Sequence, residues 1–337
     1  MTSSQVTLGV VLAAVAITSS CGSETSALGN EIKVRSSYLI RAPSGAVFDG
    51  PIWLGARHRV VVTLTPPGKG TDAAYDHLYS LKLTGGELTR LRLPQQRGCK
   101  LTSQSGAVAL PDGRVGYLQE CWGQEIPHNA KYLRTYDQAT GRIGYLRPYP
   151  LVVSAGRFAV SRSGQVVIND GRGLSERLLR LTPTRAEPIA LPFTRVGYPS
   201  WSPNGRWLAL DAVPNTEHAE GVARLDLGRN LYLLDRHGRV RRRLLHDLVD
   251  AGPAGWSPDG RWLALALQPA HRDPGLYLVN VETGTMHLLM KGDVGGAAWI
   301  GAYQIVAAVG VFSDLPGGHG PAGLERIRLM GQLDHTH

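Results

Sequence analysis

Apolar residues in this chain occur in short runs that are separated by turns rich in Gly, Pro, Asn and Asp. Pairs of runs such as "HLYSLKL" and "ELTRLRL", or "GLYLVNV" and "TMHLL", alternate apolar and polar positions on either side of a Gly-centred turn. A period of two residues is typical of half-buried β-strands, and such turns supply the backbone angles that hairpins need. The pattern therefore predicts an all-β fold of many short antiparallel strands, and no segment carries a sustained helical period.

The longest of these patterns occurs twice, as "WSPNGRWLALDA" from Trp201 and as "WSPDGRWLALAL" from Trp256. Weaker copies align at four further positions, which are Trp53, Ala109, Val160 and Trp299. Each copy predicts a strand, a tight turn, a second strand, a variable loop and a further hairpin. A period of about 40–55 residues is typical of propellers, since four short strands bury their faces only by stacking around an axis. We therefore predict a six-bladed β-propeller of four-stranded antiparallel blades over residues 38–333.

The "WSPDGRWLAL" signature resembles the repeat of TolB-type propellers, which also occurs in propellers attached to prolyl oligopeptidases. TolB-like proteins carry an α/β domain before the propeller, and we expect none here. Prolyl oligopeptidases need a hydrolase domain, and the chain has no G-x-S-x-G elbow. The resemblance thus implies the scaffold and leaves the activity open. Trp201, Trp256 and Trp299 are expected to pack between blades; stacking on a ligand is the alternative.

The first residues, "MTSSQVTLGVVLAAVAITSSCGS", predict an export signal with an apolar core too short to span a bilayer. Small residues around Cys21 resemble a bacterial lipobox. This implies a signal peptide over residues 1–20 and a protein anchored by lipid on the outer side of the cytoplasmic membrane. Residues 21–37 are then a tether, and residues 334–337 are a flexible tail. Two features depart from the pattern: Thr18 stands where Leu is usual, and no Lys or Arg precedes the apolar core. The alternative is a plain secretory signal and a secreted protein.

Cysteine usage agrees with export, because only Cys99 and Cys121 follow Cys21. An even pair in an oxidising compartment favours a disulfide, and two buried free thiols are the alternative. The predicted topology places both residues on the side of the propeller that carries its long loops. We therefore predict that they form a disulfide.

Overall composition is that of an ordinary globular protein, with 43% hydrophobic and 19% charged residues. The net charge of +9 is carried mostly by Arg, either through a general bias towards Arg or through selection for an anionic partner. The run "RHGRVRRRLLHD" concentrates Arg around one hairpin. Such a cluster either binds phosphate groups or protects an outer edge strand from pairing. Nucleic acid is not an expected partner of an exported protein.

Long variable loops fall on one face of the predicted propeller, where binding residues are expected. Candidates on this face are His77, His128, His218, His271, His319, Trp122, Glu120 and Asp273. Converging His and carboxylate side chains could hold a divalent metal or transfer protons, and solvated loop histidines are the alternative. Because no local metal or catalytic motif is present, we predict no cofactor and assign no catalytic residue.

These observations lead to two hypotheses about function. The first is a monomeric, non-catalytic propeller tethered to the cell envelope, which binds a protein or polymer through its long-loop face. The second is an extracytoplasmic lyase or hydrolase that uses the His- and carboxylate-lined mouth, with a metal as an optional component.

Overall fold

The computed structural model describes residues 32–43, 46–55, 58–66, 76–93, 99, 101–122, 130–146, 157–172, 175–182, 184–215, 228–252, 254–310 and 322–330. Strands β1 to β25 are the regular elements of these residues, which confirms the predicted all-β class. The described part of the chain holds no helix with the length and hydropathy needed to cross a bilayer.

Three four-stranded antiparallel sheets follow one another along the chain, each with its strands in sequence order. The first comprises β2 (Val47–Leu54), β3 (Arg59–Thr65), β4 (His77–Lys82) and β5 (Leu88–Arg90). The second comprises β6 (Leu101–Ala109), β7 (Val115–Trp122), β8 (Ala130–Tyr136) and β9 (Ile143–Tyr145). The third comprises β10 (Phe158–Val160), β11 (Val166–Arg172), β12 (Ser175–Leu181) and β13 (Ala186–Pro188).

A nine-stranded sheet contains both strong copies of the repeat. Its first half comprises β14 (Phe193–Val196), β15 (Ser200–Trp201), β16 (Trp207–Pro214) and β17 (Arg229–Asp235). Its second half comprises β19 (Gly255–Trp256), β20 (Trp262–Pro269), β21 (Gly275–Asn280) and β22 (Met286–Lys291). The long strand β18 (Val240–Ala251) joins the halves, because its start pairs with β17 and its end pairs with β20.

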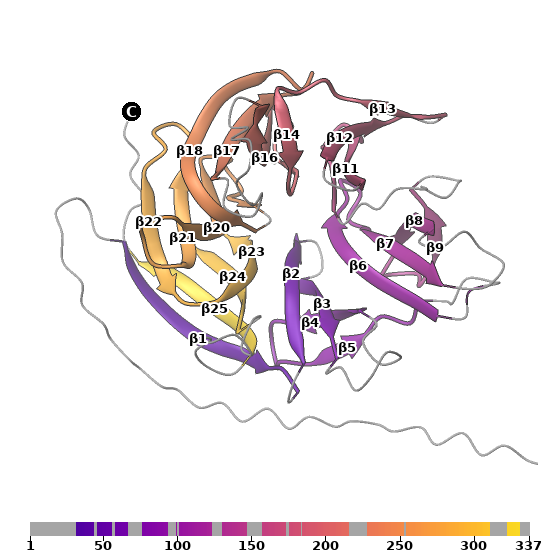
Figure 1. The fold of residues 1–337 in the computed structure, drawn as a ribbon. Coiled ribbons are helices and arrows are strands. Elements are labelled where there is room, and N and C mark those ends of the chain that lie inside the picture. The colour runs from indigo at the N-terminus through magenta and orange to yellow at the C-terminus, as the bar shows by residue number, and fades with distance from the viewer. Residues whose placement is uncertain are drawn as a thin grey trace, which may run out of the picture.

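The last sheet brings the two ends of the described chain together. Its order is β1 (Lys33–Arg41), β25 (Gly323–Met330), β24 (Gln304–Val309) and β23 (Val294–Gly301). Strand β1 runs antiparallel to β25 from the pair Lys33 and Met330 to the pair Arg41 and Gly323. Figure 1 shows the sheets standing around a common axis, with β1 along the outside of the closing sheet. This radial arrangement is that of a β-propeller.

Antiparallel order sorts the connections onto two sides of the sheets. Loops β3–β4, β7–β8, β11–β12, β16–β17, β20–β21 and β24–β25 leave one side, which we call the long-loop face. The tight turns β15–β16, β17–β18, β19–β20 and β21–β22 lie on the opposite side, which we call the short-turn face. The propeller core therefore separates two faces with different kinds of connection.

Trp residues of the repeat connect neighbouring parts of the ring. Trp256 is 9% exposed, and its indole N–H donates a hydrogen bond of 3.1 Å to the carbonyl of Ser200 in the first half of the nine-stranded sheet. Trp299 of β23 is buried and donates in the same way, over 3.0 Å, to the carbonyl of Gly255. Trp201 is also buried and packs in one cluster with Ala159 of β10, so the prediction that the three Trp residues pack between repeat units is confirmed.

Candidate functional site

The innermost strands of three sheets meet at Arg157 on the long-loop face. Arg157 directly precedes β10, forms an ion pair with Asp49 of β2, and lies 5.1 Å from the ring centroid of Tyr198, between β14 and β15. The sheet of β6 to β9 stands between the sheets that contain β2 and β10 and contacts both. The Arg157 side chain therefore reaches across the axis of the propeller. The absence of a side chain at Gly50, which has a φ of 54°, makes space for the Arg157 guanidinium, since a Cβ there would lie 3.1 Å from it.

The charge of Arg157 is stabilised by its neighbours. Burial disfavours the charged guanidinium, but Asp49 and Tyr198 outweigh this effect and raise the pKa of Arg157 above its ordinary value. Arg157 is thus a permanent cation at the centre of the long-loop face, and Asp49 and Tyr198 hold it in one orientation.

Asp76 is a second charged group of this central region, directly before β4. Its Oδ1 accepts a hydrogen bond of 2.6 Å from the hydroxyl of Thr65, and its backbone carbonyl accepts one of 2.8 Å from the N–H of Gln104 in β6. Burial raises the pKa of Asp76, the Thr65 hydroxyl opposes this, and the negative charges of Asp49 and Glu120 add to the increase. A carboxyl group with a raised pKa beside other carboxylates is a feature of functional sites.

Glu120 of β7 belongs to the same rim and forms an ion pair with Lys131 of β8, with both side chains largely buried. The next residue along β7, Cys121, forms the predicted disulfide with Cys99, over a Cα–Cα distance of 5.3 Å. Both cysteines are buried against Tyr132. The bridge therefore fixes the end of β7 that carries Glu120. Trp122 ends this strand, and its side chain lies outside the described part of the structure.

His77, the first residue of β4, lies against Arg90 of β5, with 3.0 Å between the His77 Nε2 and the guanidinium. Burial lowers the pKa of His77, and the positive charge of Arg90 lowers it further, so the ring is neutral at neutral pH. His271 is exposed in the β20–β21 connection, and nearby Asp273 pairs with Lys291 at 2.7 Å in an exposed position. The two histidines lie on different sheets, with the sheet of β23 to β25 between them.

The other predicted site residues, Cys21, His128, His218 and His319, lie outside the described residues. Within the residues that the structure describes, no group of three or more His, Cys, Asp or Glu side chains is arranged to hold a metal ion.

A buried charge network extends from the central region towards β17. Asp211 of β16 is 2% exposed and accepts hydrogen bonds of 2.7 Å from the Tyr198 N–H and 2.6 Å from the Arg229 guanidinium. Arg229 also lies 4.0 Å from Glu176 of β12. The Asp211 carboxylate occupies the space in which Gly197 would carry a Cβ, so the chain passes directly over it. The network thereby fixes the backbone of Tyr198, the residue that contacts Arg157.

Sequence reasoning did not single out Asp49, Arg157, Tyr198, Asp211 or Arg229. One available indication was the difference between the two strong copies of the repeat. Asp211 stands where the second copy has Ala266, and an acidic residue inside an apolar strand needs a partner.

No protein-family model and no curated protein matches this sequence. Solved structures resemble the fold. A protein of unknown function from Dyadobacter fermentans has a TM-score of 0.59 and 14% identity, covering 88% of this chain and 99% of that chain. XC5397 from Xanthomonas campestris, a gluconolactonase, has a TM-score of 0.55 and 15% identity, covering 88% of this chain and 90% of that chain. TolB from Acinetobacter baumannii has a TM-score of 0.52 and 13% identity over 85% of this chain, which spans 63% of the TolB chain.

These similarities define the class: the chain has a TolB-like β-propeller fold. At identities of 13–15% they extend to the fold alone. Since propellers host binding proteins and enzymes on one scaffold, function has to be argued from the site.

Proposed function

We propose that the chain is a six-bladed propeller that binds a protein or polymer partner through its long-loop face without catalysing a reaction. The blade number is supported by the strand pairing. Four sheets have four strands each, and the nine-stranded sheet contains two repeat units linked by β18. A shared strand between two units explains why the pairing merges them, and counting these units separately supports six blades.

The observation that carries the binding proposal is the position of Arg157. Its side chain lies across the axis and pairs with Asp49, so a partner meets a filled, charged surface at this point. Around it lie Asp76 and the Glu120–Lys131 pair. The disulfide and the Asp211 network fix the strands that carry this rim, and a preformed surface loses little conformational entropy on binding. A partner segment with polar groups suits such a charged rim.

Site-specific photo-crosslinking in the producing cell tests this proposal. A photoreactive residue in place of exposed His271 on the long-loop face should yield a discrete adduct, identified by mass spectrometry. The matched control replaces exposed Arg261 in the β19–β20 turn of the same half sheet, on the short-turn face. A second experiment places the photoreactive residue at Trp122. Adducts at Arg261, with none at either His271 or Trp122, would contradict binding through the long-loop face.

We further propose that the protein is held on the outer side of the cytoplasmic membrane by a lipid on Cys21. The sequence around this residue supports an exported lipoprotein. Replacing Cys21 with Ser should release the protein from the membrane fraction or leave it unprocessed. A wild-type protein that is fully soluble, with an unmodified N-terminus elsewhere, would contradict the anchor and leave a secreted protein.

A second candidate function is an extracytoplasmic hydrolase or lyase, and the raised pKa of Asp76 favours it. A carboxyl that holds its proton at higher pH can act as a general acid. The two functions separate in one variant, Asp76→Asn. An enzyme would lose turnover by a factor of about 100 or more, whereas a binding protein would show no turnover in the wild type and a weaker adduct at His271 in the variant. A stoichiometric divalent metal in the purified protein would also favour the enzyme.

A further inference from the structure

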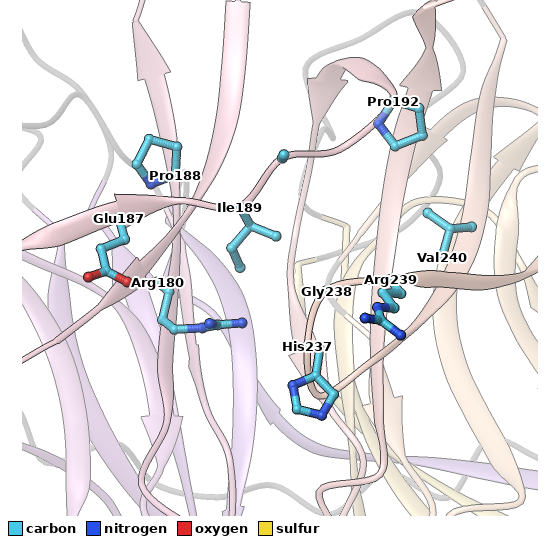
Figure 2. Close-up of a pocket in the computed structure, with 10 residues that line it drawn as sticks. Arg180, Glu187, Pro188, Ile189, Pro192, His237, Gly238, Arg239 and Val240 are labelled. Carbon is cyan, nitrogen blue, oxygen red and sulfur yellow. The ribbon is translucent and has the colours of Figure 1, made fainter.

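A cavity of about 460 Å³ lies between β12–β13 and the β17–β18 hairpin, away from the long-loop site. Figure 2 shows its walls, with Arg180 and Ile189 on one side and His237, Arg239 and Val240 on the other. This volume is within the range of small-molecule sites in proteins.

Arg180 is the polar group that requires an explanation. Its Nε is buried and has no hydrogen-bond partner in the described residues, and its side chain points into the cavity towards the hairpin (Figure 2). Buried donors in proteins are normally satisfied. The Nε of Arg180 is therefore a buried donor without a described partner, and the carboxylate nearest to it across the strands is that of Glu187, which also lines the cavity.

Nearby carboxylates are already engaged with other cations. Glu187, at the edge of the cavity, pairs with Arg185 at 2.7 Å. Asp235, at the base of the hairpin, pairs with Arg241 at 2.7 Å. Arg239 lines the cavity and forms no ion pair with a described residue. The lining therefore holds two guanidinium groups, of Arg180 and Arg239, against one carboxylate, of Glu187, so its formal charge is positive.

The hairpin also supplies His237, whose Nε2 accepts a hydrogen bond of 3.1 Å from Arg236. With Nε2 occupied as an acceptor, the neutral ring carries its proton on Nδ1 and can donate it. Gly238, with a φ of 83°, packs so closely on Ile189 that a Cβ would overlap this side chain. The hairpin is thus pressed against the chain that follows β13, which fixes the spacing across the cavity.

We propose that this cavity binds a phosphate monoester with a small apolar group. Arg180, Arg239 and His237 bind the phosphate, because guanidinium groups bind a dianion through several charge-assisted hydrogen bonds. Ile189, Pro192 and Val240 form the apolar wall against which the rest of the ligand packs. The proposal does not rest on the function assigned to the long-loop face, since it uses none of its residues.

Calorimetric titration of the purified protein with phenyl phosphate tests the proposal. We expect saturable binding with one site per chain. Arg180→Gln and Arg239→Gln should each weaken it about tenfold or more, which corresponds to the loss of one charge-assisted hydrogen bond. The matched control is Arg177→Gln, since Arg177 is exposed on the same strand, β12, and does not line the cavity. This variant should bind as the wild type does.

Three further probes define the ligand. Inorganic phosphate should bind more weakly than phenyl phosphate, and phenol should not bind measurably. Benzoate binding as tightly as phenyl phosphate would overturn the choice of phosphate over carboxylate. Absence of saturable binding up to about 10 mM phenyl phosphate, or equal weakening in the Arg177 control, would overturn the site itself. If Arg180→Gln does not fold, Arg180→Lys replaces it, and loss of the bidentate geometry should still weaken binding.

Discussion

The two strong copies of the repeat form the same turn at one end and differ at the other. On the short-turn face, Ser202 and Ser257 each donate from Oγ to the side chain two residues later, Asn204 at 2.8 Å and Asp259 at 2.6 Å. The same hydroxyls accept the N–H of Trp207 and Trp262, both at 2.9 Å. The turn glycines have φ values of 68° and 72°. Asn and Asp are therefore interchangeable at this position.

At the long-loop end the copies diverge. Both keep the same backbone hydrogen bond, from Gly197 to the carbonyl of Asp211 at 2.7 Å and from Gly252 to that of Ala266 at 2.8 Å. The Asp211 side chain binds Arg229 and the backbone of Tyr198, whereas Ala266 has only a methyl group to pack. The short-turn end thus encodes the scaffold, and the long-loop end is where one unit acquired a charged network next to the axis.

The largest expected effect is on the shared scaffold. Trp256→Ala should lower the free energy of unfolding by about 3–5 kcal/mol, since a large buried side chain and a hydrogen bond to Ser200 are lost together. Denaturant unfolding measures this, with Tyr303→Ala as the control, because Tyr303 is 45% exposed. A loss below about 1 kcal/mol for Trp256 would show that it does not hold neighbouring units together.

Breaking the divergent end should have the next largest effect. Asp211→Ala, which gives the first copy the residue of the second, should cost about 3 kcal/mol because Arg229 is left largely buried without its nearest carboxylate. The double variant Asp211→Ala/Arg229→Leu should recover most of this loss in the same unfolding experiment. No recovery would mean that Asp211 acts through the Tyr198 N–H rather than through the ion pair.

This comparison also explains what the sequence could reveal. The turns, the strand order and the Trp packing were predictable because each depends on residues close together in one repeat. The disulfide followed from that topology. The pair of Asp49 and Arg157 was not predictable, since these residues are 108 positions apart and meet only when the ring of sheets is closed. The pairing of β1 with β25 depends on the same closure.

Asp76 allows a test of whether the rim was selected for stability. Its raised pKa means that, above the ordinary pKa of an Asp, the folded state holds the proton more tightly than the unfolded state. Stability therefore falls as the pH rises from that value through the folded-state pKa. Asp76→Asn removes this loss and keeps an acceptor for Thr65.

Asp76→Asn should consequently raise the thermal midpoint by about 2 °C at pH 7 and by less at pH 3, where the wild-type carboxyl is protonated. Scanning fluorimetry at both pH values measures the difference. The matched control is Asp259→Asn, which reproduces the turn residue of the first copy and should change the midpoint at neither pH. An equal gain at both pH values for Asp76→Asn would contradict the electrostatic explanation.

The smallest effect is expected at the ion pair on the long-loop side of the second half of the nine-stranded sheet. Lys291 and Asp273 approach to 2.7 Å, as closely as Asp211 and Arg229, but their side chains are 64% and 58% exposed, against 2% and 16% for the buried pair. Water and salt screen such a pair, and ordering two mobile side chains offsets most of the remaining attraction. Lys291→Ala should therefore shift the thermal midpoint by less than about 1 °C, and added salt should not change that result. A shift as large as that of Asp211→Ala would mean that distance alone sets the strength of these pairs. A negligible shift would support burial, rather than distance, as the cause of the difference between the two pairs.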